Sequence, residues 1–315
     1  MKRLGLVGVG AWSKRYIEAV ARRVDSRIIA FARASARDDV AIEGARQYRH
    51  HGELLELASS GQLDALLVAT EPASQAEIAL AALRAGVPAF VEKPLGSNAA
   101  AVAPLLEAAR ARPSLVVVDY VHLFAPAFVA LQKRVVPASI ARIEARGHNR
   151  GPFRKSSPLY DYGTHDMAMC LALLGGEASV EVARAQRVVP AWGPPGELFE
   201  AQLRSAQCEL SVVVGNGAEA KARWLRVTLH DGRTLVYDDL QSHPHKLTDG
   251  DEVVRVETTP PLDAALDFFL TRIGSADSSS HVAASLDFSH RVASALDHID
   301  VAARQQPSGD GRKEN

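Results

Sequence analysis

Cysteine is scarce in this sequence, and neither sign of charge is in excess. The 315 residues include two cysteines, Cys170 and Cys208, which lie far apart inside apolar segments. We therefore expect buried reduced thiols, as in a cytoplasmic protein, rather than a disulfide or a metal-binding pair. The formal net charge of −1 disfavours a surface that follows the phosphates of DNA or RNA, so no nucleic-acid partner is expected.

We expect neither a signal peptide nor a membrane span at the N-terminus. Lys2 and Arg3 run directly into a glycine-rich stretch, without the apolar core or cleavage site of a signal peptide, and no membrane partner is expected. The overall composition is that of a globular protein, with 47% apolar and 23% charged residues. A chain of this length is too long for a typical single domain and fits two.

The first domain, expected over residues 1–121, alternates short β-branched runs with alanine-rich helical patterns. Strands that alternate with crossover helices predict a doubly wound parallel sheet of the Rossmann type, in an α/β fold. The predicted strands are 4–9, 27–31, 65–69, 89–91 and 115–118, and the predicted helices are 13–23, 36–46, 52–59, 74–85 and 98–111.

The second domain, expected over residues 122–305, has a different rhythm. Runs of strands joined by turn signals predict an α+β domain with a mainly antiparallel open sheet. Its strands are predicted at 139–147, 179–189, 197–204, 207–214, 222–229 and 233–237, and its helices at 126–133, 161–174, 261–273 and 282–304. Residues 306–315 form a polar tail that we expect to be disordered.

A glycine motif, Gly8-x-Gly10-x-x-Ser13, follows the first predicted strand and precedes a helical pattern. In a dinucleotide site Gly8 would make the turn, Gly10 would leave room for the phosphates, and Ser13 would set how closely helix and strand pack. Ala11 and Trp12 would belong to the same cofactor loop. The alternative is an ordinary tight turn between a strand and a helix.

Ligands of a doubly wound sheet bind at the carboxyl ends of its strands. The expected cofactor residues at these ends are Arg33, Ser35, Thr70, Glu71, Pro72, Glu92 and Lys93. No acid follows the second strand before Asp38, whereas Arg33, with Ser35 or Arg37, could hold a 2′-phosphate, so the sequence favours NADP over NAD. The alternative is that these arginines are simply solvated.

Two short motifs could carry chemistry. Glu92-Lys93-Pro94 would place an ammonium at a strand end, before a proline that favours a cis bond more than other residues do. Asp161 and His165 lie four residues apart, which on a helix puts carboxylate and imidazole on one face. The alternatives are a surface lysine, an Asp161 that caps its helix, and a structural histidine.

These motifs in this order resemble the Gfo/Idh/MocA oxidoreductases, named after glucose-fructose oxidoreductase, inositol dehydrogenase and rhizopine catabolism. The resemblance covers nearly the whole chain through the glycine motif, 64–70, 85–95, 122–128 and Asp161-x-x-x-His165. It implies that Lys93, Asp161 and His165 are catalytic, with His165 as the base and Lys93 orienting the reacting oxygen. It also implies a homodimer or homotetramer.

The sequence departs from the family pattern at two positions. Ala168 stands where the family often has another acid, which puts a secondary contact to the substrate or to the histidine in doubt. Gln75 stands where many members have histidine, a change expected to affect the cofactor pocket more than the chemistry.

The expected substrate residues are Tyr120, His122, Asn149, Arg150, Arg154 and Tyr160. The loop 146–155 is basic and resembles that of family members that oxidise UDP-linked amino sugars, although a solvated loop is an alternative. His243 and His245 lack a third ligand, so no metal is assigned.

The predicted function is hydride transfer between NAD(P) and a secondary hydroxyl or ketone of a sugar, cyclitol or nucleotide sugar. Two alternatives stay open: a catalytically idle nucleotide-binding regulator, and a reductase of a non-sugar substrate.

Overall fold

The computed structural model describes residues 1–10, 12–33, 41–111, 115–151, 157–175, 177–189, 196–206, 208–275 and 281–305. The chain folds into two compact units. The first unit combines Met1–Tyr120 with Leu262–His290, and the second contains Val121–Pro261 and the chain from Arg291 on. The segment 262–290 therefore belongs with the parallel sheet, whereas the sequence assigned it to the second domain.

The first unit is built on a six-stranded parallel sheet. Its strands run in the order β3-β2-β1-β4-β5-β6, which is the strand order of a Rossmann fold and confirms that prediction. The strands are β1 (Lys2–Val7), β2 (Ser26–Ala32), β3 (Arg46–Tyr48), β4 (Ala65–Val68), β5 (Ala89–Glu92) and β6 (Val116–Asp119).

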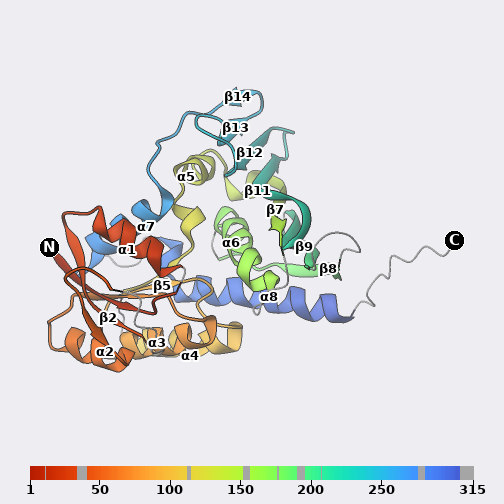
Figure 1. The fold of residues 1–315 in the computed structure, drawn as a ribbon. Coiled ribbons are helices and arrows are strands. Elements are labelled where there is room, and N and C mark those ends of the chain that lie inside the picture. Colours follow the sequence, from red (N-terminus) through yellow and green to blue (C-terminus); the bar gives the residue numbers. More distant parts are fainter. Residues whose placement is uncertain are drawn as a thin grey trace. The chain divides into compact units, whose positions relative to one another are not determined.

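Helices cover both faces of this sheet (Figure 1). The helices α2 (His51–Ser59), α3 (Pro72–Ala85) and α4 (Ala99–Ala111) pack side by side on one face. On the other face lie α1 (Ser13–Ala21) and α7 (Pro261–Arg272), where Phe90 of β5 contacts Tyr16 and Phe269 at ring distances of 5.7 and 5.5 Å. Ion pairs from Arg22 and Arg23 to α7 help to join the C-terminal segment to this unit.

The predicted helix 36–46 is wrong over its described part. Residues 41–45 are not helical, and Gly44 has a φ of +71°, a left-handed conformation that ends any helix. The chain then enters the short edge strand β3, which the sequence did not predict. Residues 34–40 lie outside the described part of the chain.

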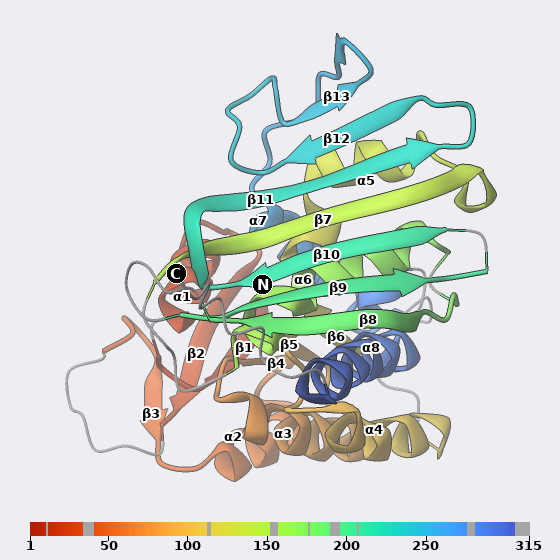
Figure 2. The same ribbon diagram turned by 90° about the vertical axis from the view of Figure 1, so that its right-hand side faces the viewer.

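The second unit is built on an eight-stranded sheet (Figure 2). Its order is β14-β13-β12-β11-β7-β10-β9-β8, and every pairing is antiparallel except that of β7 with β10, which confirms a mainly antiparallel sheet. The strands are β7 (Ile140–Arg150), β8 (Glu181–Val188), β9 (Leu198–Arg204), β10 (Glu209–Gly215), β11 (Gly217–Leu229), β12 (Thr234–Asp238), β13 (Leu247–Asp249) and β14 (Glu252–Val253).

The helix α6 (Pro158–Leu173) packs against β7, β9 and β10. Because sheet and neighbours surround it, nearly all of its residues from Tyr162 to Leu173 are buried, charged ones included. The remaining helical segments of the chain are α5 (Pro126–Gln132), α8 (Leu286–Gln305), and the 3-10 turns η1 (Val121–Phe124), η2 (Pro137–Ser139) and η3 (Val282–Ala284). Of these, η3 and the first residues of α8 belong to the first unit.

Three features of this unit differ from the prediction. The strand β7 extends to Arg150 and so includes residues expected in a loop. The consecutive strands β10 and β11 do not pair with each other in a hairpin, because they pair with opposite edges of β7. The short strands β13 and β14 were not predicted, because two or three residues are too few to show the alternation of apolar and polar side chains that marks a strand.

Two further findings concern the cysteines and the helices. Cys170 and Cys208 are buried free thiols, as expected. Of the helices in the described residues, none is long and apolar enough to cross a membrane.

Candidate functional site

The glycine turn has the geometry that the sequence predicts. Gly8 has a φ of +90°, and a Cβ atom there would overlap the carbonyl oxygen of Ala69. Gly10 is different, because no described atom lies within 4 Å of the place that a Cβ would take. Gly8 is therefore required by the turn and its packing, whereas Gly10 keeps open space beside the backbone, as a bound pyrophosphate needs.

Ser13 braces this turn with its hydroxyl group. The Ser13 Oγ donates a hydrogen bond to the Gly8 carbonyl oxygen at 2.9 Å and accepts one from the Gly10 N–H at 3.1 Å. The side chain is fully buried where α1 begins. A serine at this position thus replaces close glycine packing with two hydrogen bonds. Ala11 lies outside the described residues.

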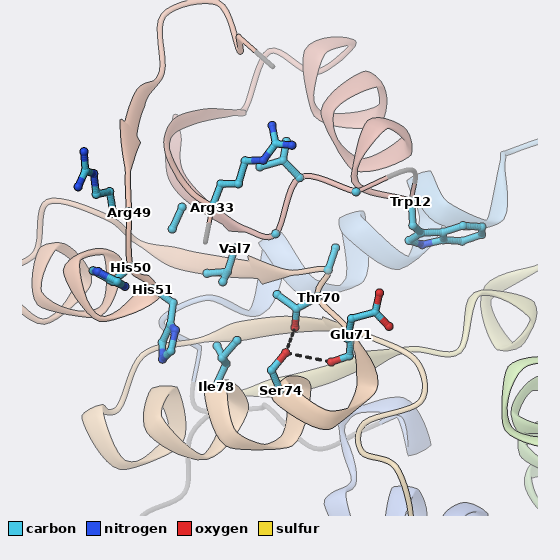
Figure 3. Close-up of a pocket in the computed structure, with 15 residues that line it drawn as sticks. Val7, Trp12, Arg33, Arg49, His50, His51, Thr70, Glu71, Ser74 and Ile78 are labelled. Atoms are coloured by element: carbon cyan, nitrogen blue, oxygen red, sulfur yellow. Dashed lines mark hydrogen bonds between the residues drawn. The ribbon is translucent and has the colours of Figure 1, made fainter. Parts of the chain in front are cut away.

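A pocket of about 740 Å³ opens beside this turn (Figure 3). It is lined from the carboxyl ends of β1, β2 and β4, where ligands of this fold bind. Of the expected cofactor residues it includes Gly8, Gly10, Trp12, Arg33, Thr70 and Glu71. Ser13, Pro72, Glu92 and Lys93 do not belong to its described lining, and Ser35 lies outside the described residues.

This pocket also has a basic group that was not predicted. Arg49, His50 and His51 line it from the turn between β3 and α2. His50 caps α2 by accepting from the Glu53 N–H, while Glu53 accepts from the His50 N–H at 3.0 Å. The run Arg-His-His was visible in the sequence, but the missing prediction of β3 hid its position at a strand end.

The residues that follow β4 are joined by hydrogen bonds, and several of them line the pocket. Ser74 Oγ contacts Thr70 Oγ1 at 2.9 Å and the Glu71 carbonyl oxygen at 3.0 Å (Figure 3). Gln75, at the position where the family often has histidine, is buried and donates to the Thr70 carbonyl oxygen at 2.8 Å. Pro72 is the first residue of α3 and shapes the helix start.

Lys93 lies at the end of β5 in the same unit. Its exposure is 9%, and the Lys93–Pro94 peptide bond is cis, a form that proline makes more accessible than other residues do. The preceding Glu92 side chain accepts a hydrogen bond from Tyr16 of α1. The alternative of a surface lysine is therefore wrong, because both side chains of this pair are buried.

Asp161 and His165 lie on α6 in the second unit. The helix begins at Pro158 with Ser157 as its N-cap, so Asp161 sits in the first turn and is not the cap. The His165 ring, 7% exposed, meets the His122 ring edge to face at 4.9 Å. His122 Nδ1 in turn contacts Tyr237 Oη at 3.0 Å. The structure thus brings His122, an expected substrate residue, against the expected base.

A buried ion pair follows His165 along the helix. Asp166 Oδ2 accepts from Arg223 of β11 at 2.6 Å, with side-chain exposures of 0% and 12%. Burial raises the pKa of Asp166, although the charge of Arg223 opposes this rise. Tyr237, Asp166 and Arg223 were all missed, since their partners are distant in sequence.

The other expected substrate residues have mixed positions. Tyr120 is buried in the first unit. Its ring packs edge-on against the ring of Phe288, with 5.8 Å between the ring centroids. The Tyr160 hydroxyl donates to Asp297 of α8. Asn149 and Arg150 belong to the end of β7 rather than to a loop, and Arg154 lies outside the described residues.

Comparisons with known proteins agree with this fold. Residues 2–120 match the model of the GFO_IDH_MocA oxidoreductase family, described by an NAD-binding Rossmann fold. Inositol 2-dehydrogenase from Rhizobium meliloti strain 1021 is 25% identical to this chain over 98% of the chain and 91% of its own length.

Two solved structures are similar over nearly their whole length. A protein from Magnetospirillum magnetotacticum MS-1 is 26% identical, with a TM-score of 0.78 over 96% of this chain and 99% of that one. KijD10, a 3-ketoreductase from Actinomadura kijaniata solved in complex with NADP and TDP-benzene, has a TM-score of 0.76 at 18% identity, over 96% of this chain and 97% of that one, a likeness of fold alone. Sequence motifs, fold and comparisons agree in one resemblance: residues 2–120 match the Gfo/Idh/MocA oxidoreductase family, and the chain as a whole is similar to inositol 2-dehydrogenase.

Proposed function

We propose that the protein is an NAD(P)-dependent oxidoreductase that interconverts a secondary hydroxyl and a ketone on a sugar, cyclitol or nucleotide sugar. The observation that carries this proposal is the pocket beside Gly8 and Gly10. Its glycine turn, its place at the strand ends and the open space at Gly10 fit a dinucleotide. The inositol dehydrogenase and the ketoreductase among its relatives supply the substrate class.

The proposed chemistry divides among three residues. His165 would accept the proton of the substrate hydroxyl, which a neutral imidazole can do near physiological pH. Asp161, one helical turn earlier on α6, would favour the charged imidazolium that results. Lys93 would orient the oxygen and stabilise the negative charge that develops on it. Bound NAD(P) would supply the hydride acceptor, and the same three residues would serve the reverse reaction, the reduction of a ketone.

The cofactor is proposed to be NADP rather than NAD. Arg33 and Arg49 both line the pocket, from the ends of β2 and β3, where the adenosine ribose of a Rossmann ligand lies. Two guanidinium groups suit a 2′-phosphate through charge-assisted hydrogen bonds. The pocket lining in the described residues includes one acid, Glu71, which stands at the end of β4.

A fluorescence titration with NADPH and NADH tests this proposal. We expect tighter binding of NADPH, with a loss of about tenfold in Arg33→Ala and in Arg49→Ala, because each loses a charge-assisted hydrogen bond. NADH binding should change little. The control is Arg46→Ala, an arginine of β3 that stacks on Tyr48 and is not in the pocket lining. Equal losses for both nucleotides would contradict the 2′-phosphate contact, and failure of both to bind would contradict the dehydrogenase itself.

A substrate screen then tests the reaction. Inositols, sugars and nucleotide sugars would be mixed with the preferred nucleotide, and nicotinamide absorbance followed in the parent and in His165→Ala. We expect turnover that His165→Ala abolishes without loss of nucleotide binding. Binding without turnover would favour an idle regulator, and turnover with imines or dihydrodiols alone would favour a non-sugar reductase. The homodimer or homotetramer implied by the family resemblance would be measured by sedimentation.

A further inference from the structure

A buried cluster of Tyr16, Glu92 and Asp119 lies at the end of the parallel sheet, directly beside Lys93. The Tyr16 Oη atom is 2.8 Å from Glu92 Oε2 and 2.7 Å from Asp119 Oδ2. The three residues have exposures of 0%, 7% and 1%. They come from three elements, α1, β5 and β6, and Glu92 and Asp119 are direct partners across the two strands.

The number of protons in this cluster follows from its geometry. A tyrosine hydroxyl has one hydrogen, and an ionised carboxylate can only accept. Tyr16 can therefore donate to one carboxylate, while the second short contact needs a proton on the other carboxyl group. Two ionised carboxylates this close in a buried place would repel strongly, so the pair retains one proton. Burial raises the pKa of Asp119 to about 6, and burial with the charge of Asp119 raises that of Glu92.

Lys93 is the cation that acts on this pair. Its positive charge favours the ionised form of both carboxyl groups, against the effect of burial. The groups that influence either carboxyl are thus Tyr16, Lys93 and the other member of the pair. While the pair keeps its proton, one negative charge faces the ammonium group, and loss of that proton to solvent adds a second.

We propose that Tyr16, Glu92 and Asp119 form a proton-sharing cluster that sets the charge facing Lys93, and that Asp119 is a positioning residue for Lys93. The second half of this proposal rests on the proposed function, in which Lys93 holds the reacting oxygen. With one negative charge behind it, the ammonium group is balanced and available to the substrate. With two, it is drawn toward the cluster, so turnover should fall as the shared proton is lost.

The proton itself is tested without any substrate. Infrared spectra of the whole protein at neutral pH should show the C=O band of a protonated carboxylic acid, and the band should move when the buried groups are labelled with ¹³C. Asp119→Asn and Glu92→Gln should each abolish this band, because the remaining carboxylate takes the Tyr16 hydrogen bond alone. The control Asp64→Asn removes an acid of the same unit that pairs with Arg3. Absence of the band in the parent, or its survival in both variants, would overturn the cluster.

The effect on Lys93 is tested by kinetics over a range of pH. Asp119→Asn leaves the Glu92 carboxylate as one constant negative charge beside Lys93, and it should change the dissociation constant of the nucleotide by less than about twofold. It should also remove the decrease in kcat that accompanies loss of the shared proton in the parent. A parent-like pH profile in Asp119→Asn would overturn the positioning role. If the parent binds no nucleotide, the proposed function fails, whereas the infrared result still decides the cluster.

Discussion

The hydroxyl group of Tyr237, a residue of β12, contacts the Nδ1 atom of His122, and the His122 ring packs against the ring of His165. The tyrosine is fully buried, and its contact with His122 is partly buried. This contact fixes the orientation of the His122 ring, and the His122 ring limits where the imidazole of His165 can lie. Tyr237, which no sequence motif singles out, therefore supports the proposed base through His122.

We expect Tyr237→Phe to lower the free energy of unfolding by about 1 kcal/mol, because the partner nitrogen of His122 loses a partly buried hydrogen bond. Urea unfolding followed by circular dichroism measures this loss. The control is Tyr48→Phe, which removes a tyrosine hydroxyl from the first unit. If His165 is the base, Tyr237→Phe should also reduce kcat while the nucleotide affinity stays constant. An unchanged stability would show that the hydroxyl is replaced by water.

At the scale of elements, the contact between α6 and the large sheet depends on one glycine. Gly147 of β7 leaves the space in which Asp166 of α6 reaches Arg223 of β11. A Cβ atom at this position would overlap Asp166 Oδ2 and crowd the guanidinium group. The helix that carries Asp161 and His165 is thus held against the sheet by a buried ion pair that tolerates no side chain at Gly147.

Gly147→Ala should destabilise the protein by about 3 kcal/mol, since it displaces one partner of a buried ion pair. Gly52→Ala is the matched control, because no described atom lies within 4 Å of a Cβ at this position of α2. It should be neutral or stabilise by about 0.5 kcal/mol, as alanine is the better helix former. Thermal unfolding of both variants measures the difference, and equal midpoints would contradict the packing described.

The elements that the sequence predicts well are those with a regular pattern of their own. The apolar runs of β1, β2, β4, β5 and β6 were found because a strand buried on both faces has a distinct composition. The strands β3, β13 and β14 were missed, because two or three residues carry no periodicity and their extended form depends on a neighbouring strand.

The same limit applies to the site. Gly8, Gly10 and Arg33 could be selected because their roles follow from local backbone geometry and from the end of a strand. Tyr16 and Tyr237 could not, since each acts through a contact with residues about a hundred positions away. Local motifs thus locate the pocket. The fold brings in distant residues, such as Tyr16 and Tyr237, that hydrogen-bond to the candidate site residues.

At the scale of the whole molecule, the dependence of stability on pH combines two opposing sets of carboxyl groups. The pKa values of Asp25, Asp64 and Asp249 are lowered, chiefly by hydrogen bonds to arginines. Their stabilisation is present above the unfolded pKa and is lost as the pH falls through the folded pKa. Asp119 acts in the opposite sense, because burial raises its pKa from 3.8 to about 6.

We therefore expect the Asp119 carboxyl to cost nothing at low pH and to destabilise the fold as the pH rises from about 4 to about 6, where the folded protein holds a proton that the unfolded chain has lost. Asp119→Asn removes this cost, on the order of 3 kcal/mol at neutral pH. Urea unfolding of parent and variant at several pH values measures the difference, in which the contributions of acids outside the Glu92–Asp119 pair cancel. The difference should grow toward neutral pH. If it grew toward acid pH instead, the Asp119 carboxyl would be a stabilised anion and the cluster would hold no extra proton.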